Sequence, residues 1–242
     1  MLTLSNISWR TPGGEQILDN ISLMIPDGKL LVITGPNGGG KTTLAKLIAG
    51  LETPSSGRIL LDGRDITELD VTGRARCGIS YAFQQPVRFK GLTVRDILEL
   101  AAGPGRSERE LCTILSKVGL CAKEYADREI DASLSGGEIK RIEIATVLAR
   151  HARFTVFDEP EAGIDLWSFD GLIDVFNELR QKIDGSLVVI SHQERILAIA
   201  DEVVVISEGR IRQSGSGEKV LPGLLRGEPR CPSCPNKEES RL

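Results

Sequence analysis

Long apolar runs, a surplus of positive charge and a regular set of cysteines are all missing from this sequence of 242 residues. No apolar run approaches the roughly 18 residues that a membrane-spanning helix needs. The first ten residues, MLTLSNISWR, lack the basic flank, the long apolar segment and the small-residue cleavage site of a secretory signal. We therefore expect a cytoplasmic protein without a membrane-spanning segment.

The charge balance is slightly acidic, with 30 Lys and Arg residues against 34 Asp and Glu residues and a net charge of -4. A broad nucleic-acid-binding surface usually needs a basic surplus. The sequence therefore argues against a nucleic-acid partner. Its hydrophobic content of 40% and charged content of 26% are ordinary for a globular protein.

Cysteine usage gives little support to a disulfide framework, because three of the five cysteines are scattered and only Cys231 and Cys234 form a CxxC pair. Two cysteines are half of a structural zinc site, and no histidine lies near them in the sequence, so a complete site needs another chain. The flanking prolines and polar residues suit a flexible end of the chain. Both interpretations stay open.

Short apolar segments separated by turns predict strands in the first third of the chain, namely LTLSNISW, ILDNISLMI, LLVITG, GRILLDG and GISYAF. After residue 151, the apolar strands FTVFDE, SLVVISH and EVVVISEGRI alternate with helices expected over about 166–183 and 195–200. Strands that alternate with helices predict an α/β fold with a parallel sheet covered on both faces.

Between about residues 93 and 151 the pattern is helical, with apolar residues three and four positions apart in TVRDILELAA and SERELCTILSKVGL. Thr93 and Asp96 match a capping box at the start of this segment. The segment has no strand candidate, so we predict a helical lobe inserted in the sheet. The main domain then covers residues 1–213, and a polar extension rich in Gly and Pro covers 214–242.

A glycine-rich loop, GPNGGGKTT, follows the strand LLVIT, precedes a helix and matches the pattern G-x-x-x-x-G-K-[ST]. In that context backbone N–H groups surround phosphate oxygens, Lys41 reaches the terminal phosphates, and the Thr42 hydroxyl is placed to bind Mg2+. The N-terminus of the helix adds partial positive charge. The predicted nucleotide-binding residues are Gly35, Pro36, Asn37, Gly38, Gly39, Gly40, Lys41, Thr42 and Thr43.

Two acidic residues, Asp158 and Glu159, end the apolar strand FTVFDE. Ligands of open α/β sheets bind at the C-terminal ends of the strands. Asp158 can hold Mg2+ through water, and Glu159 can orient or deprotonate an attacking water. An acidic pair of this kind is common by itself, so the functional interpretation depends on its pairing with the glycine-rich loop.

Six motifs in one order make the chain resemble the ABC-type ATPases over about residues 1–213. GPNGGGKTT is similar to Walker A, FTVFDE to Walker B and LSGGE to the ABC signature. Gln84 in AFQQP resembles the Q-loop glutamine, Asp165 in EAGID the D-loop aspartate, and His192 in VVISHQ the switch histidine. The resemblance implies a P-loop NTPase fold with a RecA-like core, an N-terminal antiparallel β subdomain and an inserted α-helical signature subdomain.

The resemblance also implies a head-to-tail dimer with ATP and Mg2+ held between two copies of the chain. The signature of one copy would face the nucleotide of the other through Ser135, Gly136, Gly137 and Glu138. Within one copy, Mg2+ would be bound by Thr42, Gln84 and Asp158. Glu159, Gln84 and His192 would form the catalytic set, in which Glu159 acts on the water and His192 contacts the γ-phosphate. Asp165 could also cap the helix that follows it.

The adenine contact departs from the usual pattern of the family. Many relatives stack adenine on an aromatic residue at the position that Thr11 occupies here, two residues after Trp9. Because Trp9 alternates with apolar residues in a strand, we predict that it is packed rather than stacked on a base.

The sequence LSGGE also predicts a local structure, and this prediction does not depend on the family resemblance. Ser135 and Glu138 match a capping box, in which the hydroxyl caps the first turn and the carboxylate returns to the Ser135 amide. Most relatives have glutamine in place of Glu138, and a carboxylate near phosphate adds repulsion. We therefore predict that Glu138 points back at its own helix, while free N–H groups at the helix start face an anion.

Two biological systems fit these motifs. The sequences GGEIKRIEI, AFQQP and DEPEAGID resemble the Suf-type ATPase of iron–sulfur cluster assembly, SufC, which implies a soluble scaffold partner similar to SufB and SufD. The alternative is the energy-coupling subunit of a membrane transporter, which would dock on membrane-spanning subunits through the helical lobe and the loop after Gln84.

Overall fold

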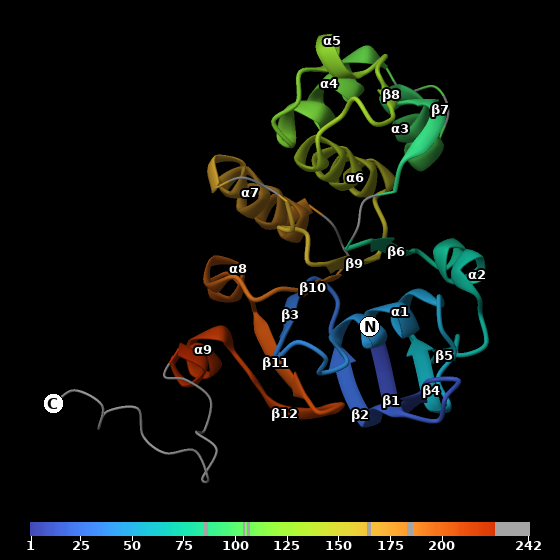
Figure 1. Ribbon diagram of the computed structural model, residues 1–242, viewed down its shortest axis with the longest axis vertical. Helices are drawn as coiled ribbons and strands as arrows, with labels where there is room; N and C mark the ends of the chain where they lie inside the picture. Colours follow the sequence, from blue (N-terminus) through green and yellow to red (C-terminus); the bar gives the residue numbers. More distant parts are fainter. Residues whose placement is uncertain (85–86, 104, 106, 164–165, 183–185, 226–242) are drawn as a thin grey trace, which may run out of the picture.

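The computed structural model describes residues 1–84, 87–103, 105, 107–163, 166–182 and 186–225. The described residues form two large sheets and an upper helical lobe, which also carries a small sheet of two strands (Figure 1). The central sheet has six strands in the spatial order β12-β11-β3-β10-β9-β6. Their bounds are β12 Arg210–Gly215, β11 Glu202–Ser207, β3 Leu30–Thr34, β10 Ser186–Ile190, β9 Phe154–Asp158 and β6 Ile79–Ala82.

All neighbours in the central sheet are parallel except the edge pair β11 and β12, which form an antiparallel hairpin. Strand β3 explains why the sheet is covered on both faces. Its residues are all buried, and they alternate between two apolar cores: Leu31 and Ile33 pack in one, whereas Leu30 and Val32 pack in the other. The predicted parallel α/β sheet is confirmed, with β12 as its antiparallel edge.

The second sheet is antiparallel and has the order β2-β1-β4-β5. Its strands are β1 Leu2–Arg10, β2 Gln16–Ile25, β4 Ser56–Leu61 and β5 Arg64–Asp65. Helix α1, Lys41–Ala49, lies between this sheet and the central sheet and buries Leu44, Leu47 and Ile48 in the core that both sheets share. The glycine-rich loop is therefore held between two sheets.

The helical lobe contains α3 Val94–Ala102, α4 Glu108–Lys117, α5 Ala122–Tyr125 and α6 Gly136–Arg150. It lies at the opposite end of the molecule from the antiparallel sheet (Figure 1). The predicted capping box is present, because Thr93 and Asp96 exchange hydrogen bonds at the start of α3. The absence of strands from this segment was wrongly predicted. Strand β8, Glu129–Ile130, pairs with β7, Phe89–Thr93, and a two-residue strand is too short for a period-two pattern.

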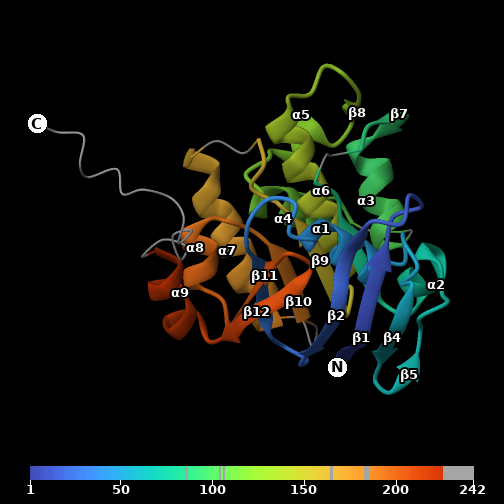
Figure 2. The same ribbon diagram turned by 60° about the horizontal axis from the view of Figure 1, so that its bottom comes forward.

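The remaining helices are α7 Leu166–Lys182, α8 Glu194–Ala198, α9 Gly217–Leu225 and α2 Val71–Arg76. The predicted helices near 166–183 and 195–200 correspond to α7 and α8. The sequence analysis predicted neither α2 nor α9. Helix α9 packs beside α8, and Figure 2 shows both on the side of the molecule away from β1 and β4. Val220 of α9 is buried in the core, so tertiary packing stabilises a helix that contains Pro222.

Arg74 of α2 is a fully buried arginine that closes the C-terminal end of α1. Its guanidinium group donates to the carbonyl oxygens of Leu47 and Ile48 in α1, and to those of Thr67 and Leu69 in the loop before α2. Burial lowers the pKa of Arg74 to about 10, so the group stays positively charged at neutral pH. A cation at this place also complements the dipole of α1.

Replacing Arg74 by alanine is expected to lower the free energy of unfolding by about 3–5 kcal/mol, because several buried carbonyl groups lose their donor. Chemical denaturation measures the change. Arg76→Ala is the matched control, since Arg76 is exposed on the same helix. Equal losses in the two variants would show that the buried hydrogen bonds of Arg74 contribute little.

Candidate functional site

The glycine-rich loop joins the end of β3 to the start of α1, and its glycines are required by close contacts. Gly35 has a φ of 133°, and a Cβ atom there would lie 2.0 Å from the carbonyl oxygen of Ile206. Gly40 has a φ of 101°, and its Cβ would lie 2.6 Å from a methyl group of Leu18. One side of the loop therefore packs against β11 and β2. A ligand would have to bind on the other side.

Lys41, the first residue of α1, curls back over the loop. Its Nζ atom donates to the carbonyl oxygens of Gly35 at 2.8 Å and Pro36 at 2.9 Å. The side chain is buried, and burial lowers the pKa of Lys41, while the carboxylates of Glu159 and Asp158 act against this change. The ammonium group is therefore in the loop, where the sequence analysis predicts the terminal phosphates.

The other loop residues differ in exposure. Pro36, Asn37 and Gly38 are exposed, whereas Gly39 and Gly40 are buried and Thr42 and Thr43 are half-buried. The Gly39 carbonyl accepts a hydrogen bond of 3.2 Å from the N–H of Gly209, in the turn between β11 and β12. The exposed tip and the supported base give a preformed cradle.

Asp158 ends β9 and is completely buried. One carboxylate oxygen accepts from the Thr42 hydroxyl at 3.2 Å, and the other accepts from the hydroxyl of Tyr81 at 2.9 Å. Burial raises the pKa of Asp158, whereas both hydroxyl donors lower it. The sequence analysis did not predict a role for Tyr81, although the residue lies in the strand that leads to Gln84.

Glu159 follows Asp158 with a φ of 48°, in the left-handed region that a non-glycine residue rarely adopts. Its N–H donates to the carbonyl oxygen of Ile190 at 3.0 Å, which holds the backbone there. Its side chain accepts from the Gln84 amide at 2.7 Å. Backbone strain of this kind is concentrated at functional sites, and here it turns the carboxylate toward Gln84.

His192 lies in the loop after β10. Burial of its ring, followed by the positive charge of Lys41, lowers the pKa of His192, and Glu159 acts in the opposite direction. The lowered pKa favours the neutral imidazole. Gln84, Glu159 and His192 follow the C-terminal ends of β6, β9 and β10, so the predicted catalytic residues lie at one edge of the central sheet.

These residues fit Mg-ATP. The glycines of the loop are in close contact with Ile206 and Leu18 on one side, so a phosphate would bind on the other side. Thr42 and Asp158 supply neighbouring hydroxyl and carboxylate oxygens, which are the ligand types that Mg2+ prefers. Gln84 was also predicted as a metal ligand; its amide nitrogen donates to Glu159 at 2.7 Å, and its role as a ligand through the amide oxygen stays a prediction.

The signature residues form the predicted capping box at the start of α6. The Ser135 N–H donates to Glu138 at 2.7 Å, and the Glu138 N–H donates to the Ser135 hydroxyl at 3.2 Å. Glu138 also accepts from the Tyr125 hydroxyl and lies 3.8 Å from Arg128. Tyr125 first, and then Ser135, lower the pKa of Glu138 to about 2. The prediction that Glu138 turns toward its own helix is confirmed.

Ser135 and Gly136 are exposed, and a Cβ atom on Gly136 would meet nothing within 4 Å. Gly137 approaches the backbone of Gly163, whose carbonyl oxygen would lie 3.1 Å from an added Cβ atom. The start of α6 therefore offers open backbone on one side and contacts the loop after β9 on the other. The predicted D-loop residue, Asp165, lies outside the described residues.

Glu161 is a further acidic residue in the loop after Glu159, and the sequence analysis did not single it out. It accepts from the Ser191 hydroxyl at 2.5 Å, and the Ser191 oxygen accepts from the Gln193 N–H at 3.0 Å. Burial raises the pKa of Glu161. This chain of hydrogen bonds joins the loop after β9 to the residues on both sides of His192.

Trp9 is partly buried and packs against the core below α1, as its alternating pattern predicts. Thr11, two residues later, forms a turn in which its N–H donates to Glu15 at 2.9 Å and its hydroxyl accepts from the Glu15 N–H at 3.2 Å.

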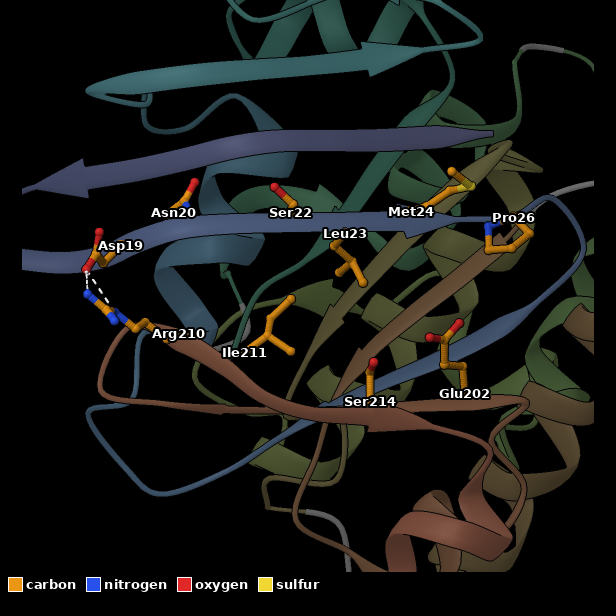
Figure 3. Close-up of a pocket in the computed structure, with 10 residues that line it drawn as sticks. All are labelled: Asp19, Asn20, Ser22, Leu23, Met24, Pro26, Glu202, Arg210, Ile211 and Ser214. Atoms are coloured by element: carbon orange, nitrogen blue, oxygen red, sulfur yellow. Dashed lines mark hydrogen bonds and ion pairs between the residues drawn. The ribbon is translucent and has the colours of Figure 1, made fainter.

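A large groove of about 750 Å3 runs between the edge strands β2 and β12 (Figure 3). An ion pair between Asp19 and Arg210 spans it at one end, and Met24 and Pro26 lie toward the other end. None of the predicted nucleotide-binding residues lines it, so this groove is separate from the site described above.

Within the described ranges, no helix is long and apolar enough to span a membrane. The same part of the chain contains no group of three or more His, Cys, Asp and Glu residues placed to hold a metal ion. Cys231 and Cys234 lie outside it, so the prediction about the CxxC pair stays a prediction.

Comparison with known proteins adds independent evidence. The family model described as ABC transporter matches residues 18–162. The uncharacterized ABC transporter ATP-binding protein MJ0035 of Methanocaldococcus jannaschii is 38% identical over 216 residues, which cover 86% of each chain. The sulfate/thiosulfate import ATP-binding protein CysA of Synechocystis is 32% identical and covers 90% of this chain. The choline transport ATP-binding protein OpuBA of Bacillus subtilis is also 32% identical and covers 91%. The chain spans only 61% of CysA and 59% of OpuBA.

Solved structures agree on the fold. A nucleotide-free ATP-binding cassette from an ABC transporter superposes with a TM-score of 0.79 at 28% identity, covering 94% of this chain and 95% of that one. The dimeric ATP-binding cassette MJ0796, bound to ADP and Pi after hydrolysis, has the same TM-score at 23% identity, covering 89% of this chain and 98% of that one. At 23% identity the second match supports the fold alone.

Proposed function

The chain belongs to the ABC transporter family, and on that premise we propose that it is the ATP-binding subunit of a membrane transporter that works as a head-to-tail dimer. The family hydrolyses ATP, so the chain is an ATPase that uses ATP and Mg2+. The fold is the one that the motifs predicted, an α/β core with an antiparallel β subdomain and helical parts.

The proposed chemistry uses the residues gathered at the sheet edge. Lys41 and the N–H groups of the loop bind the terminal phosphates and balance their charge. Glu159 accepts the proton of the attacking water, and Gln84, hydrogen bonded to it at 2.7 Å, orients that water and fixes the carboxylate. A neutral His192 can donate one hydrogen bond to the γ-phosphate and keep its other nitrogen as an acceptor.

Mg2+, when bound, neutralises the charge that develops on the phosphate oxygens. Thr42 and Asp158, which are hydrogen bonded to each other, are the residues that would hold it. Tyr81 keeps the carboxylate of Asp158 in place from the side opposite Thr42.

The dimer proposal is supported by the signature at the start of α6. The Glu138 carboxylate is held by the Ser135 N–H and the Tyr125 hydroxyl, so it turns back along its own helix, while the neighbouring Gly136 is exposed. Free N–H groups at a helix start attract anions. In a second copy, the γ-phosphate of bound ATP supplies that anion.

Replacing Ser135 by arginine is expected to abolish ATP-driven dimerisation, because the long side chain would occupy the space of the partner's γ-phosphate. Light scattering with Mg-ATP, in a Glu159→Gln background that slows hydrolysis, measures the dimer. Ser116→Arg is the matched control, since Ser116 is exposed on α4 of the same lobe. Because the loss of an N-cap costs about 1 kcal/mol, Ser135→Asp is also tested. It keeps the cap and repels phosphate, so an intact dimer in Ser135→Asp and Ser135→Arg would contradict the proposal.

The single observation that carries the transporter proposal is an apolar groove of about 340 Å3 between β6, α3 and α6, beside Gln84. Several large apolar side chains are exposed in it: Phe83, Val87, Phe89 and Leu100 are 39%, 43%, 41% and 73% exposed. Such a patch is typical of a protein-binding surface. Relatives that act in sulfate, thiosulfate and choline transport support membrane-spanning subunits as the occupant, and docking there would hold the chain at the inner face of the membrane.

A scaffold of iron–sulfur cluster assembly is the second candidate, and one observation favours it. The sequence from Glu138 to Glu143 resembles Suf-type ATPases, with the basic pair Lys140 and Arg141 before the acidic residue. None of the relatives reported above is named as a Suf-type ATPase, and two are named for transport, so the transporter has the better support.

Co-purification separates the two candidates. The tagged chain is expressed in its source organism and recovered from detergent-solubilised membranes and from the soluble fraction, and bound proteins are identified by mass spectrometry. Membrane-spanning subunits are expected with the wild type, and they should be lost in Leu100→Asp but retained in Val71→Asp. Val71 is the matched control, because it is 43% exposed on α2, outside the groove. A soluble scaffold in place of membrane subunits would overturn the transporter proposal.

A further inference from the structure

Lys140 is a fully buried lysine in the second turn of α6, and the mechanism above leaves it without a role. Its Nζ atom donates to the backbone carbonyl oxygen of Phe83 and lies 2.9 Å from the carboxylate of Glu143, one turn further along the same helix. Lysine is almost never fully buried unless it is paired. The burial of Lys140 is therefore explained by these two partners, the Phe83 carbonyl oxygen and the Glu143 carboxylate.

Glu143 completes a clamp on the same residue, because it accepts from the backbone N–H of Phe83 at 2.7 Å. The two side chains of α6 thus bind both backbone groups of Phe83 while they pair with each other. Phe83 lies directly after β6 and directly before Gln84. Its ring also meets the ring of Tyr81 edge to face, with 4.9 Å between the ring centres.

We propose that Lys140 and Glu143 are positioning residues for hydrolysis, which fix the backbone of Phe83 and so hold the Gln84 amide against Glu159. The Gln84 side chain is exposed, so no packing holds it. Its direction depends on the backbone to which it is attached, and that backbone is anchored at the preceding residue. A misplacement of about 1 Å at such a site can cost two orders of magnitude in rate.

The energetics of buried charge support a positioning role over a purely stabilising one. Removing two charges from water costs several kcal/mol, and a buried ion pair is often no more stabilising than apolar side chains of the same size. A buried pair that also binds both backbone groups of one residue instead fixes the geometry of that residue. Because α6 begins with the signature, the clamp also ties the Q-loop residue Gln84 to the helix that faces the partner subunit.

The test separates stability from catalysis. The double variant Lys140→Met with Glu143→Leu removes the clamp and leaves no unpaired charge, so its melting temperature is expected to equal or exceed that of the wild type. Its kcat for ATP hydrolysis should fall about tenfold or more, while KM for ATP changes by less than about threefold. Glu143→Gln can still accept from the Phe83 N–H but leaves Lys140 without its anionic partner, so its melting temperature should fall while its kcat falls less than in the double variant.

A matched pair elsewhere controls for the loss of an ion pair. Lys117 of α4 and Glu178 of α7 lie 2.6 Å apart in the structure. Lys117→Met with Glu178→Leu should therefore leave kcat within about threefold of the wild type. A folded double variant of Lys140 and Glu143 with unchanged kcat would overturn the proposal, as would an equal fall of kcat in the control.

Amide hydrogen exchange tests the clamp without any variant. The Phe83 amide of the wild-type protein is expected to exchange about a hundredfold or more slowly than an unprotected amide, because a buried carboxylate accepts its hydrogen bond. A fast-exchanging Phe83 amide would show that the clamp is not formed in solution, whether or not the double variant folds.

Discussion

Lys41→Ala is expected to weaken ATP binding on the order of 100-fold or more, since hydrogen bonds to charged groups contribute about 1.5–3 kcal/mol each and Lys41 can reach two phosphates. The structure adds a second reason. The Lys41 ammonium group holds the carbonyl oxygens of Gly35 and Pro36 across the loop, so the variant loses the cation and also the shape of the cradle. Equilibrium binding of a fluorescent ATP analogue with Mg2+ measures the change.

Lys46→Ala is the matched control for Lys41, because Lys46 lies on the same helix and is exposed to solvent. Its affinity for the analogue should stay within about twofold of the wild type, as expected for a screened surface charge. If Lys41→Ala binds the analogue as tightly as Lys46→Ala does, the glycine-rich loop is not the phosphate site.

Glu159→Gln should lower kcat about 100-fold or more and leave ATP binding intact, because a general base contributes about 10²–10⁴ to the rate. Glutamine has nearly the same shape as glutamate and keeps an oxygen that can accept from the Gln84 amide, so the strained backbone at 48° need not change. The variant also removes a negative charge beside the phosphates. It should therefore accumulate as an ATP-bound dimer, which size-exclusion chromatography with Mg-ATP can detect.

Glu161→Gln tests whether the effect is specific to Glu159. Glu161 lies in the same loop, and burial already raises its pKa, so an amide suits its surroundings and can still accept from Ser191. Its kcat should stay within about threefold of the wild type. Hydrolysis near the wild-type rate in Glu159→Gln would exclude Glu159 as the base.

Lys41→Ala and Glu159→Gln test two different steps of the reaction cycle, ATP binding and ATP hydrolysis. Lys41→Ala should bind ATP too weakly to form the dimer, whereas Glu159→Gln should form the ATP-bound dimer but hydrolyse ATP slowly. Both results are independent of the biological partner, because neither Lys41 nor Glu159 lines the apolar groove beside Gln84. Failure of the transporter proposal would therefore leave the ATPase site intact.

Features that depend on short stretches of chain could be predicted from the order of the residues alone. The strand, glycine-rich loop and helix around Lys41 were predicted from one motif, because strand pattern, turn and helix start are encoded in neighbouring residues. The capping boxes at Thr93 and Ser135 were predicted for the same reason, since their partners are three residues apart. The direction of Glu138 followed from its box alone.

Contacts between distant stretches of the chain depend on how the elements pack in space. Tyr81 and Asp158 are 77 residues apart, and Phe83 and Glu143 are 60 residues apart, so no local pattern reports that either pair is hydrogen bonded. The burial of Arg74 could not be predicted either, because a charged residue in a sequence is usually expected to be exposed. Its side chain is buried because carbonyl groups of α1 accept its hydrogen bonds. Burial of a charge is favourable only when its partners converge in space. That convergence is set by how the sheets and the helical lobe pack, which is why the chemistry could be predicted from the sequence and the arrangement that orients it could not.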